Sequence, residues 1–259
     1  MIYTLKTAFL FLLKGHFKLA FLLFKKRYKP LRVKVKSYTL SIPDAKSFVF
    51  TYDEIWNRQI YTFKSSDSSY IIDAGANIGL SVLFFVEYYP KSQIIAFEPD
   101  PKICDYLLKN IQNNRIQNVQ VIQKALWNNE GTLYFRSEGA DGGHLTEQLS
   151  AQPLSVQTER LSKYIQKPVD MLKMDIEGAE YIVLAEIAPC LHLVKNIFIE
   201  YHSFDNQPQS LSKILDILEE HNFHVYVESI GIKSSRPLWE LKTMNGMDLQ
   251  LNIWGRKRI

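Results

Sequence analysis

The sequence predicts an α/β fold whose doubly wound, mostly parallel seven-stranded sheet ends in a C-terminal antiparallel hairpin. From residue 70 onward, short apolar segments alternate with segments of helical length, and strands that alternate with helices form parallel sheets. The first of these strands ends in a glycine-rich turn at residues 75–79, directly before an apolar helix. At such turns an α/β sheet brings its backbone close to a nucleotide-like ligand.

Composition places the chain among globular proteins. Its 259 residues are 46% hydrophobic and 22% charged, with a net charge of +4. The length accommodates one large domain with an N-terminal extension. The mild positive charge suits a membrane surface or an anionic substrate, but it is smaller than the charge expected of a dedicated nucleic-acid-binding protein. The two cysteines, Cys104 and Cys190, lie far apart, which favours a reducing compartment. We therefore expect a cytoplasmic protein.

Residues 1–32 predict a basic, amphipathic helical extension. Residues 8–24 are strongly apolar, but Lys14 and Lys18 interrupt them, which is costly in a membrane-spanning helix. A signal peptide would need an uninterrupted apolar core and a small-residue cleavage site. Two interpretations stay open. The segment packs on the domain or on a second copy of the chain in a homodimer, or residues 1–27 make a peripheral contact with the anionic inner membrane face.

Residues 33–66 predict a β-rich lead-in to the main sheet. Residues 33–42 alternate between apolar and polar types, as a half-buried strand does. Pro43 and Asp44 predict a turn, and residues 47–51 a second short strand. This segment covers one end of the sheet, where it either helps to form a substrate pocket or only covers an edge.

Residues 67–259 contain the main sheet. Its seven predicted strands comprise residues 70–72, 93–97, 119–122, 169–174, 196–201, 223–227 and 248–254. The predicted helices comprise residues 80–89, 101–114, 178–187 and 211–220. Asp100 is placed to cap the second helix, and Pro101 suits its first turn. A further short antiparallel strand is expected at residues 132–135.

Two carboxylates, Asp73 and Glu98, indicate the chemistry of the ligand. Glu98 ends the second strand, where a carboxylate can accept both hydroxyl groups of a ribose. Asp73 stands directly before the glycine turn, where its charge suits a cationic ligand and repels a pyrophosphate. S-adenosylmethionine (SAM) carries a sulfonium, an ammonium and a ribose. The charge pattern therefore favours SAM over NAD.

Several motifs in this order resemble the FkbM-type methyltransferases, a SAM-dependent class I family. The matching positions are residues 73–79, 97–101, Asn110, 125–126, 173–180 and 200–202. The resemblance implies a Rossmann-like sheet and methyl transfer to oxygen, often on sugars or polyketide-like acceptors. Before about Ser47 the sequence carries no matching motif.

The expected cofactor site follows the first three strands. Its predicted members are Asp73, Gly75, Ala76, Asn77, Gly79, Glu98, Pro99 and Ala125. The glycine turn is expected to cradle the methionine end of SAM through backbone amides and the Asn77 side chain. Asp73 is expected near the sulfonium or ammonium, Glu98 at the ribose, and Ala125 beside the adenine ring.

Asp175, Glu200 and His202 are the predicted catalytic residues. They follow the fourth and fifth strands, at the sheet edge where ligands bind in open α/β folds. Methyl transfer depends largely on positioning, and an alcohol acceptor also loses a proton to a carboxylate or histidine. Asp175 or His202 is expected to be that base. Alternatively, the three side chains hold a divalent metal that acidifies the hydroxyl, but their spacing is no metal fingerprint and no metal ligand is assigned.

Three nearby residues receive weaker expectations. Glu177 either belongs to the acidic edge or stabilises the first turn of the following helix, and Glu180 is expected to have that structural role. His144 ends a glycine-rich segment, residues 138–144, which either closes over the acceptor or forms a surface loop.

We therefore expect a SAM-dependent O-methyltransferase acting on a small-molecule, glycan or other polyhydroxy acceptor, with no nucleic-acid partner. A nucleic-acid (RNA) methyltransferase is one alternative, but no RNA-binding module or Asn-Pro-Pro-aromatic motif is recognisable. A non-catalytic ligand-binding subunit of the same fold is another. The intact carboxylates Asp73, Glu98, Asp175 and Glu200 argue against it.

Overall fold

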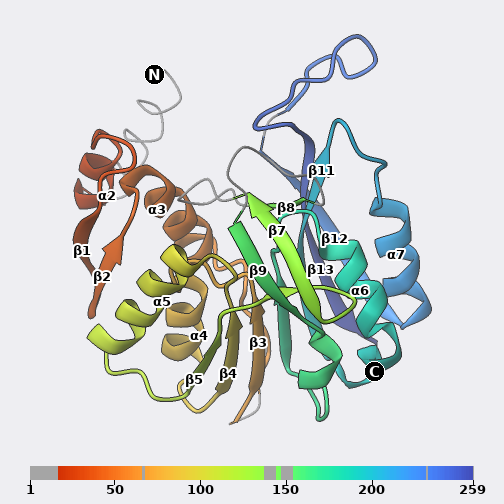
Figure 1. Cartoon of the computed structure of the whole chain (residues 1–259), viewed down its shortest axis with the longest axis horizontal. Helices are drawn as coiled ribbons and strands as arrows, with labels where there is room; N and C mark the ends of the chain where they lie inside the picture. Colours follow the sequence, from red (N-terminus) through yellow and green to blue (C-terminus); the bar gives the residue numbers. More distant parts are fainter. Residues whose placement is uncertain (1–16, 66–67, 137–143, 147–153, 232, 259) are drawn as a thin grey trace.

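A seven-stranded sheet forms the centre of the computed structural model, which describes residues 17–65, 68–136, 144–146, 154–231 and 233–258. Its strands are β3 (Tyr70–Ala74), β4 (Gln93–Phe97), β5 (Val119–Ile122), β10 (Met171–Met174), β11 (Asn196–Phe204), β12 (Phe223–Ile230) and β13 (Met247–Lys257). They lie in the order β12-β13-β11-β10-β3-β4-β5 (Figure 1). The five neighbouring strands β11, β10, β3, β4 and β5 are parallel to one another. Strand β13 is antiparallel to both β11 and β12. The predicted mostly parallel sheet and its terminal hairpin are confirmed.

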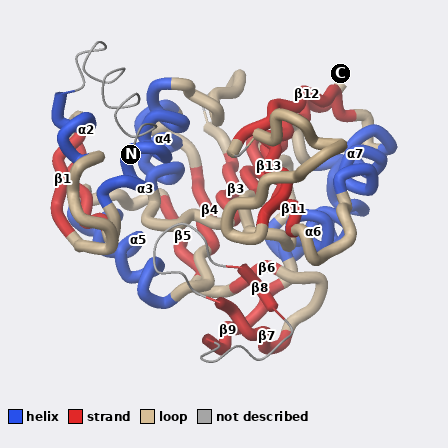
Figure 2. The backbone as a smooth tube through the Cα atoms, turned by 90° about the horizontal axis from the view of Figure 1, so that it is seen from above, coloured by secondary structure: helices blue, strands red, loops and turns tan. Residues whose placement is uncertain are grey.

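Helices cover both faces of this sheet (Figure 2). One side carries α4 (Leu80–Tyr88) and α5 (Pro101–Asn113), and the other carries α6 (Glu180–Ile187) and α7 (Leu211–Glu220). Side chains alternate along a strand, so Ile71 packs into one core cluster and Ile72 into the other. All five residues of β3 are buried, as expected for a parallel strand covered on both faces.

The start of α5 confirms the predicted cap. The carboxylate of Asp100 accepts hydrogen bonds from the backbone N–H groups of Lys102 at 2.8 Å and Ile103 at 3.3 Å. Pro101 is the first helical residue, where its missing N–H has no intrahelical partner to lose. The cap holds the end of β4 and the start of α5 in one fixed arrangement.

The lead-in differs from its prediction in two ways. Residues 33–42 do not form one strand, because Lys36 has a left-handed φ of +50° that turns the chain between β1 (Leu31–Val35) and β2 (Tyr38–Ile42). The strand predicted at residues 47–51 is wrong, since this segment belongs to α3 (Ala45–Tyr52). Asp44 caps that helix by accepting a hydrogen bond from the N–H of Ser47 at 2.9 Å. The Asp44 cap is a helix-start signal that the sequence analysis interpreted only as a turn.

A short helix, α2 (Phe17–Leu22), precedes the hairpin and packs on the same core as α3 through Leu19 and Leu22. A π-helical turn, η1 (Asp53–Asn57), follows α3. Residues 1–16, half of the predicted basic extension, lie outside the described residues. Among the helices that the structure describes, none has the length and apolar character needed to cross a bilayer.

A second, four-stranded sheet lies beside the main one (Figure 2). It contains β6 (Ala125–Leu126), β7 (Gly131–Arg136), β8 (His144–Thr146) and β9 (Leu154–Glu159) in the order β6-β9-β7-β8. The strand predicted at residues 132–135 is confirmed as part of β7, whereas its partner strands were not predicted. His144 begins β8, and residues 138–143 of the predicted glycine-rich segment lie outside the described residues. Two 3-10 helices, η2 (Leu161–Tyr164) and η3 (Ala188–Leu193), flank β10 and α6.

Candidate active site

A cavity of about 970 Å³ opens at the carboxyl ends of β3, β4, β10 and β11. β3 and β10 are adjacent, and the helices that follow them cover opposite faces of the sheet (Figure 2). This is the point where strand order reverses and where open α/β sheets bind ligands. Of the eleven predicted cofactor-binding and catalytic residues, all except Asp73 and Gly79 line the cavity.

The turn after β3 requires glycine at two positions. Gly75 has a φ of +83°, and a Cβ there would lie 1.8 Å from the backbone oxygen of Asp175. Gly79 has a φ of +90°, and its Cβ would lie 2.7 Å from Cδ1 of Leu107. Residues that carry a side chain rarely adopt such φ values, and the space that a Cβ would need at both positions is already occupied. The glycines therefore let the turn pack directly against the end of β10 and against α5.

The backbone amides of this turn have acceptors within the protein. The N–H groups of Gly75 and Ala76 donate to the carbonyl oxygen of Phe97 at 3.1 Å and 2.8 Å. The N–H of Asn77 donates to Oε2 of Glu98 at 2.9 Å. These amides, which were expected to cradle a ligand, instead hold the turn against the end of β4. The turn contributes its shape to the cavity wall.

Glu98 joins the turn to the start of α5. Its Oε1 accepts from the N–H of Asp100 and its Oε2 from the N–H of Asn77, both at 2.9 Å. Burial raises the pKa of Glu98 to about 7, although the two hydrogen bonds act in the opposite direction. A carboxylate has about four acceptor sites, so Glu98 is held in one orientation and can still accept hydrogen bonds from a ligand in the cavity.

Asp73 lies behind the cavity wall, where it pairs with a buried lysine. Its Oδ2 accepts a hydrogen bond from Oγ of Ser81 at 2.5 Å, and its Oδ1 lies 3.3 Å from Nζ of Lys173. The same Nζ lies 3.5 Å from Oδ2 of Asp175. Burial alone would lower the pKa of Lys173, but Asp73 and Asp175 outweigh burial and raise it. The cation next to Asp73 in this structure is therefore Lys173.

His202 of β11 lies among carboxylates. Its Nδ1 is 2.9 Å from Oε1 of Glu180, and its Nε2 is 3.5 Å from Glu200 and 3.6 Å from Glu177. Burial alone would lower the pKa of His202, but these three carboxylates raise it well above its usual value. The hydrogen bond with His202, together with one from Gln250, likewise outweighs burial and lowers the pKa of Glu200. At neutral pH, His202 is therefore an imidazolium that binds its acidic neighbours.

Asp175 is the better candidate for a base. Burial, reinforced by the charge of Glu200, raises the pKa of Asp175 to about 6, although Lys173 and His202 act in the opposite direction. At neutral pH this carboxylate is mostly ionised and can take a proton, whereas His202 already carries one. The two residues predicted as alternative bases are thus distinguished by their surroundings.

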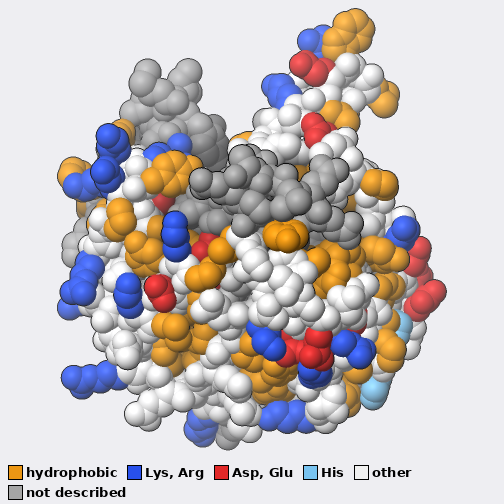
Figure 3. All heavy atoms as spheres, in the orientation of Figure 1, with side chains coloured by type: hydrophobic (Ala, Val, Ile, Leu, Met, Phe, Trp, Pro, Cys, Tyr) orange, Lys and Arg blue, Asp and Glu red, His pale blue; other side chains and the backbone are white. Residues whose placement is uncertain are grey.

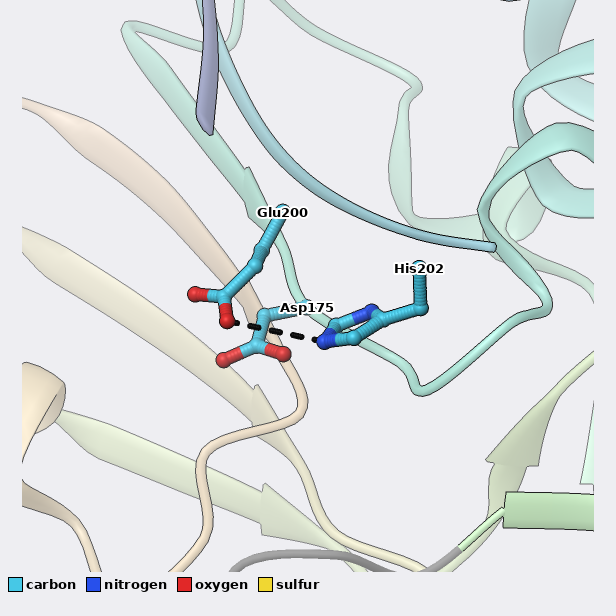
Figure 4. A group of neighbouring side chains, drawn as sticks. All are labelled: Asp175, Glu200 and His202. Carbon is cyan, nitrogen blue, oxygen red and sulfur yellow. Dashed lines mark ion pairs between the residues drawn. The ribbon is translucent and has the colours of Figure 1, made fainter. Parts of the chain in front are cut away.

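Asp175, Glu200 and His202 converge from two neighbouring strands (Figure 4). Each offers one ligand atom, and these atoms all lie within 4.8 Å of one another. Oxygen and imidazole ligands suit several divalent ions, so the three side chains fit the alternative of a metal site. A metal bound at Nε2 would have to displace the proton that the carboxylates favour there.

Comparison with known proteins identifies the family. The model of the methyltransferase FkbM domain matches residues 73–225, which is more than half of the chain. The match begins at Asp73 and includes the glycine turn, Glu98, Asp175 and His202. This protein belongs to the FkbM methyltransferase family. The predicted family resemblance is confirmed.

Relatives of this FkbM-family methyltransferase cover much of its length. The methyltransferase sdnD of Sordaria araneosa is 30% identical over 58% of this chain and 73% of its own. The 2-O-methyltransferase NoeI of Sinorhizobium fredii is 27% identical over 62% of this chain and 76% of its own. Among solved structures, methyltransferase FkbM from Methylobacillus flagellatus is 15% identical, with a TM-score of 0.48 over 81% of this chain and 51% of that one.

Four residues that the sequence analysis overlooked, or assigned only a structural role, complete the site of this family member. Lys173 was detectable, since it is a charged residue in an otherwise apolar strand. Glu180 was assigned to the helix start, where it does accept hydrogen bonds from the N–H of Gly178, but it also binds His202. Glu54 of η1 and Gln250 of β13 line the cavity, and no local pattern distinguishes either.

Proposed function

We propose that this methyltransferase moves a methyl group from SAM to a hydroxyl group of a glycan or another polyhydroxy acceptor. The observation that carries the proposal is the placement of carboxylates along one cavity. Glu98 follows β4, Asp175 follows β10, and Glu200 lies within the neighbouring strand β11. A ribose-bearing cation fits this arrangement, because one carboxylate can accept the ribose hydroxyls while the others favour the positive charge.

The donor orientation follows from these positions. Glu98 accepts the ribose hydroxyl groups, and Ala125, which is buried on the cavity wall, contacts the adenine ring. The sulfonium then points toward Asp175 and Glu200. Asp73 does not contact the donor directly in this arrangement, because Lys173 neutralises it.

The transfer is an in-line displacement. The acceptor oxygen attacks the methyl carbon, the carbon–sulfur bond breaks, and its electron pair returns to sulfur to give a neutral thioether. The hydroxyl proton passes to Asp175, whose pKa of about 6 leaves it ionised at neutral pH. His202 holds Glu200 in place and compensates its charge. Positioning and proton removal together supply the catalysis.

Two observations support an oxygen acceptor. A carboxylate of moderately raised pKa is a suitable base for a hydroxyl group. In addition, a relative that matches 62% of this chain carries the name 2-O-methyltransferase. The lead-in and the segment between β12 and β13 both contribute residues to the cavity wall, and these segments would contact the acceptor.

Calorimetry with purified full-length protein tests the donor. We expect SAM to bind and NAD not to bind, because a pyrophosphate would be repelled by Asp175 and Glu200. Binding of NAD without SAM would overturn the proposal. Incubation with methyl-labelled SAM and a panel of lipid-linked sugars, nucleotide sugars and RNA then tests the acceptor. Label in RNA but in no glycan would support the nucleic-acid alternative instead.

The metal alternative is tested independently of turnover. Titration with Mn²⁺, followed by electron paramagnetic resonance, would show a bound ion in the wild type and none in the Glu200→Gln variant if Asp175, Glu200 and His202 form a metal site. Full activity after exhaustive chelation would exclude a metal-dependent reaction.

A further inference from the structure

The described part of the N-terminal extension exposes an aromatic stripe. Phe17, Phe21 and Phe24 are 66%, 63% and 61% exposed. Their spacing places them on one side of a helix, while Leu19 and Leu23 on the other side are buried in the core. The outward side of α2 and of the residues directly after it therefore exposes three phenylalanines.

The loop between β12 and β13 exposes a second apolar group. Residues 233–246 extend away from the body of the molecule at the top of Figure 1. Leu238 is fully exposed, Trp239 is 82% exposed and Leu241 is 55% exposed. Figure 3 shows hydrophobic side chains gathered at the outer end of this extension. Such exposure of a Trp and two Leu residues at one tip typically marks an interaction site.

Residues that follow the aromatic stripe, and residues at the base of the loop, line the same cavity. Arg27 and Tyr28, which follow α2, line it, as do Gly231, Lys233 and Met244 of the loop. In Figure 1, α2 and the loop stand on opposite sides of the molecule, with the upper ends of the central strands between them. A flat surface that contacted both the aromatic stripe of α2 and the outer end of the loop would therefore lie across the mouth of the cavity.

Basic residues accompany both apolar groups. The α2 side carries the exposed residues Lys25, Lys26, Arg27 and Lys29, and the loop carries the exposed residues Lys233, Arg236 and Lys242. Arg27 is paired with Asp44 at 3.0 Å. Against the other six cations, Glu240 is the one acidic residue within residues 17–29 and 233–246. Nζ of Lys25 lies 4.7 Å from the ring centre of Phe21. Basic side chains around protruding aromatic and leucine side chains are typical of segments that lie in the interface of an anionic bilayer.

We propose that residues 17–29 and 233–246 together form a membrane-docking surface for an anionic bilayer. Docking would place the cavity mouth at the lipid headgroups. If the proposed function holds, docking in this position implies that the acceptor is an amphiphile. Its polyhydroxy head would enter the cavity while its apolar part stays in the membrane. A fluid bilayer can accept two separated protrusions. A symmetric contact with a second copy would bring the two basic groups onto like charges, which is unfavourable.

Vesicle sedimentation of the full-length protein tests the docking surface. We expect binding to phosphatidylcholine vesicles that contain phosphatidylglycerol and much weaker binding to phosphatidylcholine alone. The double variant Leu238→Ser with Trp239→Ser should weaken binding at least about tenfold, because two large apolar side chains no longer enter the interface. Leu108→Ser, which changes an exposed leucine of α5, is the matched control and should bind like the wild type.

Tryptophan fluorescence reports the tip directly. We expect the emission to shift to shorter wavelength when anionic vesicles are added. The Trp239→Phe variant should lose this shift while it keeps the emission of the other three tryptophans. Equal sedimentation of the wild type and the double variant would overturn the proposal. A concentration-dependent dimer in analytical ultracentrifugation that the double variant loses would also overturn it, and would assign the tip to a second copy.

SAM calorimetry on the same samples separates this proposal from the proposed function. Because Leu238 and Trp239 are exposed, the double variant should keep wild-type affinity for SAM, which also shows that it is folded. Vesicle binding without SAM binding would reject the proposed donor and leave the docking surface intact. SAM binding without vesicle binding would reject the docking surface and leave the proposed donor intact.

Discussion

Nδ1 of His202 lies 2.9 Å from Oε1 of Glu180, and both side chains are buried. The contact joins β11 to the start of α6 and turns Nε2 of His202 toward Glu177 and Glu200. Oε1 of Glu180 also accepts a hydrogen bond from the N–H of Gly178 at 3.0 Å. Glu180 is absent from the cavity wall, so it is a positioning residue that acts through His202.

The Glu180→Gln variant tests this relationship. We expect kcat to fall about ten- to a hundredfold, as for other partners that orient a site histidine, with little change in SAM affinity. Because Glu180 helps to raise the pKa of His202, removal of its charge should lower that pKa in an NMR titration. Glu219→Gln, on the exposed side of α7, is the control. An unchanged titration of His202 would contradict the assigned role.

Asp175 should determine the acid side of the activity profile. Its pKa is raised to about 6, so the carboxylate is ionised above pH 6 and loses its capacity to accept a proton as the pH falls through that value. We expect kcat to decline below about pH 6 and Asp175→Asn to lose about a hundredfold or more in kcat. SAM calorimetry should show retained binding in this variant. Asp216→Asn, an exposed change on α7, should behave like the wild type.

Glu98 should contribute mainly to donor affinity. Loss of hydrogen bonds between a carboxylate and the two ribose hydroxyls predicts about a ten- to hundredfold weaker SAM affinity for Glu98→Ala. The control is Asp105→Ala, which removes an exposed carboxylate from α5. Because Glu98 also accepts two backbone hydrogen bonds, a thermal melt must accompany the calorimetry. Wild-type SAM affinity in a folded Glu98→Ala protein would reject the ribose assignment.

A comparison of Gly75 with Gly246 distinguishes the cost of backbone strain from the cost of close packing. Gly75 and Gly246 have similar φ values of +83° and +77°, but only at Gly75 would a Cβ meet backbone atoms, while at Gly246 nothing lies within 4 Å. Gly246→Ala should cost about 1–2 kcal/mol of unfolding free energy, the cost of a left-handed alanine. Gly75→Ala should cost several kcal/mol more, or prevent folding. Denaturant unfolding measures both, and equal losses would show that the end of β10 can move.

Lys173 should be essential for stability. The Lys173→Met variant leaves Asp73 and Asp175 without their buried cation, which predicts a loss of about 3–5 kcal/mol in unfolding free energy. Adding Asp73→Asn should restore part of it, because one uncompensated charge is removed. Urea unfolding of the wild type, of Lys173→Met, of Asp73→Asn and of the double variant measures the coupling. Strictly additive losses would show that Asp73 and Lys173 do not interact.

The alternation of apolar segments was sufficient to predict the main sheet, since β3, β4, β5, β10 and β11 each contain a short, largely apolar run with polar residues at or after its end. The lead-in was harder to interpret. Residues 47–51 contain apolar side chains that suit either a strand or a helix, and the Asp44 cap decided in favour of the helix. Local periodicity cannot distinguish the two in so short a segment.

The sequence by itself determined which residue types stand in or near the strand ends: Asp73 in β3 and the glycines after it, Glu98 after β4, Asp175 after β10, and Glu200 with His202 in β11. Only the tertiary structure decided what each of them contacts. Asp73 meets Lys173 because β3 and β10, about 100 residues apart in the chain, are paired in register. Strand order and register arise from packing of both sheet faces and are not encoded in any local pattern. For that reason the acidic edge could be predicted, whereas the internal partners of Asp73, of the turn amides and of His202 could not.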